Sequence, residues 1–516
     1  MTAADGWHEW PDVARPGAGS PAGLTGPVGS GGSGGSGAPV APVAPVAPVS
    51  KRGLVGVDAD RGLPDLPQGG HRGQVRMAYR LAERYADRLL FVPRIGWHEW
   101  DGKRWAKDEQ GAATRAVLTV LKRALAQSLG DAELRQDVHR CEGAAAIRGV
   151  LEIAGNLAEF VTPADELDAD AYLLNTASGT LDLRTMQLRP PDPADRITKV
   201  TRAAYRPAEV GHGPWEVFLE QVLPDVEVRA FLQRVVGVAL LGKVVEHVLP
   251  ILTGTGGNGK GVCYGALLHA LGDYASAAEP DLFMAREGAH PTGQMDLLGR
   301  RLVVVSESDK SRQMAEATMK RLTGGDRIKA RLMGKDFVEF EPSHTAFLVT
   351  NHLPKVSGDD DAVWRRVRVV PFLVVVPEEQ RDGQLGERLE LQADAVLAWA
   401  VAGFADYLAC GRRLAEPDSV RVATDAYRAE SDAVARFLDE CCYLNKNVRA
   451  TTSDLFARWS TWAALDGADP MSQKAFGQAL DRRGLVAAAP VRGKRWRSGI
   501  ELLPADGDSE SGGWSR

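Results

Sequence analysis

The spacing of apolar residues changes several times along the chain, and each spacing predicts a different kind of element. Between residues 113 and 160 apolar side chains recur every three or four positions, which predicts helix. From residue 172 the sequence YLLNTASGTLDLRTMQLRP alternates short apolar runs with turn residues and predicts strands. Helical spacing returns over 214–242, opened by Pro214. The apolar face expected for 113–160 includes Val117, Leu118, Leu121 and Leu125, and that for 214–242 includes Phe218, Leu219, Val222, Phe231, Leu232, Val235 and Val236.

Further along, short apolar runs and helices alternate to about residue 375, helices follow over 385–430, and 432–503 reads as a small separate domain. Near the start, FVPRIGWHEWDGKRW alternates aromatic residues and carries a turn at Asp101-Gly102, which predicts a hairpin. Runs of strand and helix in turn are typical of an α/β domain, so we expect a parallel central sheet with helices on both faces.

Residues 14–50 have a different composition, with GSGGSGGSG followed by four APV units from Ala38 to Val49. Such a segment buries too little apolar surface to offset its ordering entropy, so we expect a disordered tether. The pentapeptide GWHEW occurs at Gly6–Trp10 and again at Gly96–Trp100. The first copy is either a partner-binding peptide or a chance repeat.

Composition limits the class of protein only broadly. The 516 residues carry 62 Lys and Arg against 68 Asp and Glu, a net charge of −6, so this is no small basic DNA-binding module. A large motor needs only a local basic lining, so DNA is not excluded. The five cysteines lack CxxC spacing, which argues against a zinc ribbon or a disulfide framework. With no secretory signal and no long apolar run, we expect a cytoplasmic protein of a bacterium, or of the bacterial host of a phage, with no membrane partner.

The strongest chemical signal is LPILTGTGGNGKGVCYGALLHALG at 249–272. A strand end leads into a glycine loop, and Lys260 opens a helix that stops near Gly272. Glycines let backbone N–H groups converge on phosphate oxygens, the helix N-terminus adds positive potential, and the lysine reaches the β and γ phosphates of ATP. The expected nucleotide-binding residues are Gly254, Thr255, Gly256, Gly257, Asn258, Gly259, Lys260 and Gly261. Gly261 stands where a Ser or Thr usually holds Mg²⁺, and the alternative interpretation is a plain glycine-rich turn.

A second apolar run, in RRLVVVSESDK at 300–310, predicts a buried parallel strand. Glu307 and Asp309 follow two positions apart and share one face if the strand continues. Carboxylates at such a strand end can hold Mg²⁺ or polarise an attacking water. The alternative is a pair of solvated acids.

Next, RIKARLM and DFVEFEP flank Gly334-Lys335 and predict a hairpin with a lysine near its tip. Lys329, Arg331 and Lys335 supply local positive charge that could hold the phosphates of a single DNA strand. An ordinary surface hairpin remains the alternative.

A last apolar strand, in HTAFLVTNHLPKV at 344–356, ends at Asn351, whose amide can sense the γ-phosphate and orient water. Arg365 and Arg366 follow in DDDAVWRRVRVVPF. Either could act as an arginine finger in a neighbouring subunit, which requires an oligomer. Alternatively, the pair forms salt bridges with the acids at 359–361.

Taken in order, GTGGNGKG, VVVSES, KRLTGGD…ARLMGK, VTNHLP and VWRRV resemble superfamily 3 helicases, and more closely the C-terminal half of phage and plasmid primase-helicases related to the poxvirus helicase-primase. The resemblance covers about 77–503. It implies that Lys260 belongs to the Walker A loop, Glu307 to Walker B and Lys335 to a DNA-tracking hairpin. It also implies that Asn351 is the sensor, and that Arg365 or Arg366 is the finger of a homo-hexameric ring.

The same resemblance implies a P-loop, AAA+-like motor preceded by a mixed α+β domain and followed by a winged-helix domain. The expected divisions are a disordered tail at 1–76, an α+β domain at 77–213, the ATPase with its helical collar at 214–380, a helical segment at 381–431, the winged helix at 432–505 and a second tail at 506–516. In the winged helix, Lys494, Arg495 and Trp496, with Arg492 and Arg497, are expected to contact DNA phosphates. A small protein-interaction domain is the alternative for that segment.

These patterns predict an ATP- and Mg²⁺-dependent DNA helicase that acts on single-stranded and duplex DNA in the replication of a phage, plasmid or integrated element. The tail before 77 is too short for a catalytic primase, so primase activity is expected from a separate protein. Two rivals are an ATP-gated DNA-binding or loading factor that does not unwind, and a scaffold with a degenerate site.

Overall fold

The computed structural model describes residues 70–211, 213–285, 291–307, 312–331, 337–356, 360–489 and 494–504, all within the unit Gln68–Arg516. Most of the predicted N-terminal tail and all of 506–516 lie outside these residues. Helix α1 begins at Gly73, so the predicted tail boundary at 76 is four residues too late. Arg72 and Arg76 explain the earlier start, because both donate to the buried carboxylate of Asp137. None of the described helices has the length and apolar character needed to cross a membrane.

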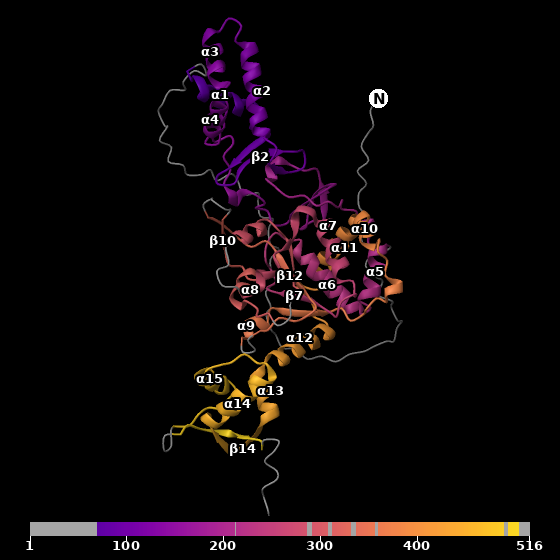
Figure 1. Ribbon diagram of the computed structural model, residues 1–516. Coiled ribbons are helices and arrows are strands. Elements are labelled where there is room, and N and C mark those ends of the chain that lie inside the picture. Colours follow the sequence, from indigo (N-terminus) through magenta and orange to yellow (C-terminus); the bar gives the residue numbers. More distant parts are fainter. Residues whose placement is uncertain are drawn as a thin grey trace, which may run out of the picture. The chain divides into compact units, whose positions relative to one another are not determined.

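The first part of the fold is a group of helices beside a small antiparallel sheet (Figure 1). Its elements are α1 (Gly73–Tyr85), β1 (Leu89–Val92), β2 (Gly96–Trp100), β3 (Trp105–Lys107), α2 (Ala112–Gln127), α3 (Ala132–Cys141) and α4 (Ala144–Ala154). The strands pair in the order β1-β2-β3, with Asp101-Gly102 between β2 and β3 as predicted. The helices share one apolar core.

The prediction of helix over 113–160 was right in type but too simple. The segment forms three helices, and on α2 the buried positions include Val117 and Leu121, whereas Leu118 and Leu125 are exposed. Apolar residues lie on more than one face of α2, and packing against α1, α3 and α4 decides which face is buried.

A second antiparallel sheet follows and leads into two helices. It contains β4 (Leu173–Thr176), β5 (Gly179–Asp182) and β6 (Gln187–Arg189), as the alternation of apolar runs and turn residues predicted. The helical stretch 214–242 is divided by Pro224 into α5 (Pro214–Val222) and α6 (Val226–Ala239), and the apolar residues predicted to pack are all buried. Leu173, Leu174 and Leu181 share a core with α5 and α6, so the predicted boundary at 213 cuts through one core.

The central sheet has five parallel strands in the order β13-β7-β12-β9-β8. They are β7 (Leu249–Thr253), β8 (Ala275–Ala278), β9 (Leu302–Glu307), β12 (Thr345–Thr350) and β13 (Val367–Pro371). The expected parallel sheet is therefore present, with β12 as its central strand beside β7 (Figure 1).

Each face of this sheet belongs to a different apolar core, because successive side chains on a strand point to opposite faces. On β12, Phe347 and Val349 join the core that includes α6, α7 (Lys260–Leu271) and α11 (Ala393–Ala409). Ala346 and Leu348 join the other core, with α8 (Glu316–Leu322), α9 (Asp361–Trp364) and Tyr427 of α12 (Asp418–Ser431). Helices thus cover both faces, as an α/β domain requires.

The remaining elements connect these layers. The hairpin predicted around Gly334-Lys335 is formed by β10 (Ile328–Ala330) and β11 (Val338–Phe340), which pair antiparallel, while its tip lies outside the described residues. Helix α10 (Leu385–Leu391) precedes α11. Short 3-10 helices are η1 (Ala164–Glu166), η2 (Pro193–Asp195), η3 (Pro207–Glu209), η4 (Gly272–Tyr274), η5 (Pro280–Phe283), η6 (Pro291–Leu297) and η7 (Glu378–Gln380).

The last part of the described chain has its own aromatic core around Phe437, Trp459 and Phe476. It consists of α13 (Ala433–Cys441), β14 (Cys442–Thr451), α14 (Thr452–Asp466), α15 (Gln473–Arg482) and β15 (Trp496–Leu502). The two strands pair antiparallel with an irregularity between Leu444 and Arg449.

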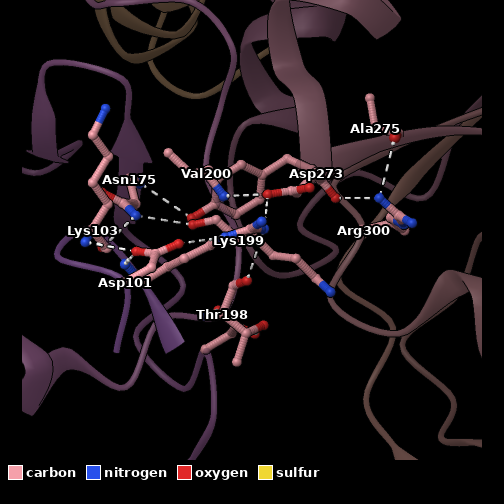
Figure 2. A network of polar contacts seen from close by, with 12 residues as sticks. Asp101, Lys103, Asn175, Thr198, Lys199, Val200, Asp273, Ala275 and Arg300 are labelled. Atoms are coloured by element: carbon pink, nitrogen blue, oxygen red, sulfur yellow. Dashed lines mark hydrogen bonds and ion pairs between the residues drawn. The ribbon is translucent and has the colours of Figure 1, made fainter. Parts of the chain in front are cut away.

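A polar network joins the early sheets to the end of α7, through Asp273 in η4 (Figure 2). The Asp273 carboxylate pairs with Arg104 and accepts from the backbone N–H of Val200 at 3.0 Å. Its own N–H donates to the Val200 carbonyl at 3.1 Å. Nearby, the Asn175 amide donates to the carbonyls of Lys103 and Lys199 at 2.9 and 3.0 Å. Residues from β4 and from the loops after β2 and β6 are therefore fixed to the helix that starts at Lys260.

Candidate nucleotide-binding site

The order of the sheet determines which predicted residues meet. Because the strands are parallel, the residues that follow β7, β9 and β12 all lie at one edge, the carboxyl edge. Strand β12 lies between β7 and β9, so Asn351 at its end is flanked by the glycine loop (residues 254–259) and by Glu307. Loops at the carboxyl edge of a parallel sheet are the usual ligand-binding position in α/β proteins.

Lys260 is the first residue of α7 and is buried, with 5% of its surface exposed. Its ammonium Nζ donates to the Gly254 carbonyl at 2.8 Å, to Asn258 Oδ1 at 3.0 Å and to Asn351 Oδ1 at 3.1 Å. The structure thus brings Lys260 and Asn351 together, as the proposed roles require. Burial lowers the pKa of Lys260, which means that the ammonium is poorly solvated and gains from an anionic partner.

Asn258 fixes the glycine loop to the neighbouring strand. Its Nδ2 donates to the Phe372 carbonyl at 3.0 Å, while its Oδ1 accepts from Lys260. A Cβ on Gly254 would lie 2.1 Å from Asn258 Nδ2 and 2.4 Å from the Phe372 carbonyl oxygen, so no larger residue fits there. The backbone of this loop can be approached closely only because the side chain is absent.

The segment after β13 is the other wall of the loop. The N–H of Phe372 donates to the Thr253 carbonyl at 2.8 Å, and that of Val376 donates to the Gly257 carbonyl at 2.9 Å. Gly257 has a φ of +63°, and the Arg381 guanidinium lies where its Cβ would be, with Nη2 at 2.6 Å from that position. No local sequence pattern identifies Arg381, because its contact with the loop spans more than a hundred residues of chain.

The acidic pair is only partly placed. Strand β9 ends at Glu307, whose backbone pairs with Thr350 in register, so Glu307 lies at the carboxyl edge as predicted. Its side chain and all of Asp309 lie outside what the structure describes. Their shared face and a Mg²⁺ site therefore stay predictions.

Arg365 and Arg366 lie at the opposite edge of the sheet. They precede β13, which runs parallel to β7 with Val367 beside Leu249, whereas the glycine loop follows the far end of β7. Five residues of strand span about 15 Å, so these arginines cannot reach the loop of their own chain. Arg366 is 8% exposed, its Nη1 donates to the Ala362 carbonyl at 2.7 Å, and burial lowers its pKa.

Arg365 differs from its neighbour because it is exposed. The predicted alternative was that Arg365 and Arg366 form salt bridges with the acids at 359–361. Asp360 and Asp361 have other partners. Asp360 pairs with Lys320, and Asp361 pairs with Arg428. Asp359 is outside the described residues.

On the hairpin, Lys329 and Arg331 are both exposed and lie over one ring. Lys329 Nζ is 5.4 Å and Arg331 Cζ is 5.0 Å from the centroid of Phe337, which is itself 41% exposed. No sequence pattern indicated a role for this phenylalanine. Lys335 lies outside the described residues.

In the C-terminal part, Lys494 and Arg495 are exposed, and Trp496 is half-buried under the Arg449 guanidinium at 4.8 Å. Arg497, in contrast, is only 3% exposed and bonds to Asp481 and to the carbonyls of Leu485 and Gly477. The expectation that Arg497 contacts phosphates is wrong, because strand β15 turns this side chain into the core. Arg492 lies outside the described residues.

Two family models match the chain. One, described as D5 N terminal like, matches residues 78–224, and the other, a family of unknown function called DUF5906, matches 252–366. A protein of Acanthamoeba polyphaga mimivirus, provisionally named a helicase, is 29% identical over 44% of this chain and 24% of its own length. A provisionally named helicase of Frog virus 3 is 25% identical over 51% of this chain and 29% of its own. A provisionally named primase of African swine fever virus is 23% identical over 39% and 22%. The chain therefore resembles viral proteins that are provisionally named helicases and primases.

Among solved structures, the apo C-terminal region of NrS-1 aligns with this chain with a TM-score of 0.44 and 10% identity, over 83% of this chain and 99% of that one. The alignments with the viral relatives span about a quarter of their lengths. The second family model begins in β7 and ends at Arg366, so it contains the glycine loop, Glu307 and Asn351.

Proposed function

We propose that this chain is an ATP-driven DNA helicase of superfamily 3, which works as a ring in the replication of a phage, plasmid or integrated element. The proposal rests on one observation above all. A buried lysine at the start of α7 meets an asparagine from the end of the adjacent strand, beside a loop of glycines at the carboxyl edge of a parallel sheet.

In this proposal the glycine loop is a P-loop that binds the phosphates of ATP. Lys260 exchanges some of its present oxygen partners for phosphate oxygens, which relieves its poor solvation. Asn351 then orients the attacking water and senses the γ-phosphate. The loop conformation is supported by Gly254, because a Cβ there would collide with Asn258 and with the Phe372 carbonyl, which hold the loop in place.

Mg²⁺, when bound, would neutralise charge on the phosphates during transfer. Glu307 and Asp309 would hold it, because carboxylate oxygens are its preferred ligands and Glu307 ends the strand next to β12. Gly261 offers no hydroxyl, so water and the phosphates would complete the coordination.

The ring follows from the position of the arginines. Because Arg365 is exposed at the edge of the sheet opposite the loop, it would complete the ATP site of a neighbouring subunit. We propose Arg365, and not the buried Arg366, as the finger of a homo-hexamer. Arg366 would then hold the backbone at Ala362 that precedes the finger.

DNA would be held at two places. Lys329, Arg331 and Lys335 of the hairpin would follow one strand by its phosphates, with the exposed Phe337 beside Lys329 and Arg331. The part that runs from α13 to β15 would be a winged helix, with Lys494, Arg495 and Trp496 contacting duplex phosphates. The viral relatives' names support nucleic acid as the substrate, and a separate primase would be a partner.

The test is ATP hydrolysis and strand displacement by purified protein. Lys260→Ala should abolish DNA-stimulated phosphate release, whereas Lys122→Ala, an exposed lysine on α2, should leave it unchanged. Lys335→Ala should keep basal hydrolysis and lose displacement of a tailed duplex. Equal loss of hydrolysis in the Lys260 and Lys335 variants would refute the division of roles.

The second candidate is an ATP-gated loading factor that does not unwind DNA. Gly261 favours it, because a weaker Mg²⁺ shell fits slow, switch-like hydrolysis better than a motor. Hydrolysis and DNA binding without any displacement would support the loader over the helicase.

A further inference from the structure

Arg381 lies against the glycine loop without having a place in the proposed mechanism. It follows η7 and is separated from Gly257 by more than a hundred residues, yet its Nη2, Cζ and Nε lie 2.6, 3.2 and 3.7 Å from the position that a Gly257 Cβ would take. The guanidinium therefore occupies the space beside the loop that a side chain would otherwise fill.

Two hydrogen bonds fix this arginine relative to the loop. Arg381 Nε donates to the Val376 carbonyl at 3.0 Å, and the Val376 N–H donates to the Gly257 carbonyl at 2.9 Å. Val376 thus connects the Arg381 guanidinium to the backbone of Gly257, the residue that the guanidinium faces. Since Nε is used, the two terminal nitrogens remain to bind another group.

The charge of Arg381 is the second part of the argument. The side chain is exposed, and among the described residues no carboxylate is within ion-pairing distance of it. The nearby Asp382 pairs instead with Arg388. The Arg381 guanidinium therefore lies beside the glycine loop, and the nearby Asp382 does not neutralise it. Such a group favours an anion with several oxygen atoms.

We propose that Arg381 binds the polyphosphate of the nucleotide from the same chain, beside Lys260. This inference rests on the proposed function, and it adds a residue that supplies its own subunit's site with a second positive charge. Lys260, at the start of α7, would contact the phosphates with its buried ammonium group. Arg381, in the segment after β13, would contact them with the two terminal nitrogens of its guanidinium.

The experiment measures displacement of a fluorescent ATP analogue by tripolyphosphate and by adenosine. In Arg381→Ala we expect tripolyphosphate to bind about tenfold more weakly, the usual scale for one charge-assisted contact, while adenosine is unaffected. Arg388→Ala is the matched control, because it removes an exposed arginine of α10 that already has a carboxylate partner.

Two further variants separate binding from loop positioning. Arg381→Gln keeps a donor for the Val376 carbonyl but loses the charge, and Arg381→Lys keeps the charge but loses the fork. If Arg381 binds phosphate, the Gln variant should bind tripolyphosphate as weakly as the Ala variant does. The Lys variant should recover part of the affinity for tripolyphosphate. Full recovery in the Gln variant would overturn the inference.

The outcomes also separate this inference from the proposed function. If wild-type protein binds the analogue, Lys260→Ala does not, and Arg381→Ala binds tripolyphosphate as wild type does, only the role of Arg381 is refuted. If wild-type protein binds no nucleotide, both proposals fail.

Discussion

At the scale of single residues, the site depends on buried polar groups that satisfy one another. Lys260, Asn258 and Asn351 form a cluster in which each amide oxygen faces the ammonium. Buried polar atoms are costly when unpaired, so such a cluster responds strongly to the loss of one member. Asn258 has the widest reach, since it joins the glycine loop to the backbone after β13.

Asn258→Ala should therefore lower stability even without nucleotide. The Phe372 carbonyl loses its donor and Lys260 loses an acceptor, which together should cost about 1–3 kcal/mol in the free energy of unfolding. Urea unfolding measures this. Asn447→Ala, at an exposed position of β14, should change stability by less than about 0.5 kcal/mol. Equal stability of the two variants would show that the Asn258 contacts contribute nothing.

His344 gives a second residue-scale prediction. It precedes β12, is 2% exposed, and neither ring nitrogen has a partner among the described residues, and burial lowers its pKa to about 4. Between the ordinary value of 6.5 and about 4, the unfolded chain binds a proton that the folded chain does not. Stability from this group is complete above pH 6.5 and is lost as the pH falls towards 4.

His344→Phe should remove this loss, which amounts to roughly 3 kcal/mol at the acid end. The measurement is the thermal midpoint as a function of pH, for the variant and the wild type. His139→Gln, a change of an exposed histidine on α3, is the control and should follow the wild-type curve. A His344→Phe curve parallel to that of the wild type would contradict the assignment.

At the scale of elements, α7 links the glycine loop to the early sheets. It starts at Lys260 and is followed by η4, where Asp273 bonds to Arg104 and to the Val200 backbone (Figure 2). Twelve residues of helix span about 18 Å. A helix of this length therefore joins the glycine loop to the early sheets through the contacts of Asp273.

Asp273→Asn tests this connection. The amide removes the negative charge that pairs with Arg104, so backbone hydrogen exchange should become at least several-fold faster around residues 199–201 and 103–105. Asp418→Asn is the control, because Asp418 is 87% exposed and pairs only within α12, where such a pair contributes little. Unchanged exchange around Val200 would mean that the remaining backbone bonds suffice.

At the scale of the whole molecule, the separation of Lys260 and Arg365 to opposite edges of the sheet is the decisive feature. One chain cannot complete an ATP site from these two residues. If the proposed ring is right, each active site contains Lys260 of one subunit and Arg365 of the next.

Mixing two inactive variants should therefore restore activity. In an equal mixture of Lys260→Ala and Arg365→Ala, roughly a quarter of the interfaces combine an intact lysine with an intact arginine. ATP hydrolysis by the mixture should exceed that of either variant alone. The corresponding mixture of Lys260→Ala with Asn351→Ala should show no such gain, because both residues belong to the same chain's side of the shared site. No recovery in the Arg365 mixture would refute the shared site.

The sequence by itself determined the elements and the chemistry that is local in the chain. The strand before Gly254, the helix from Lys260 to its stop at Gly272 and the hairpin around residues 328–340 follow from spacing and turn residues, because neighbouring positions alone decide them. The order of the motifs along the sequence also shows the resemblance to primase-helicases. Pro224, which separates α5 from α6, is a local break in the helical spacing of 214–242.

Only the tertiary structure decided which face of α2 is buried, that the strands of 173–183 share a core with α5 and α6, and that Arg497 is internal. It alone placed Asn258 against Phe372 and Arg381 against Gly257. The physical reason is the same in each case. These contacts join positions far apart in the chain, so they depend on how sheets and helices pack, which local spacing of residue types does not encode.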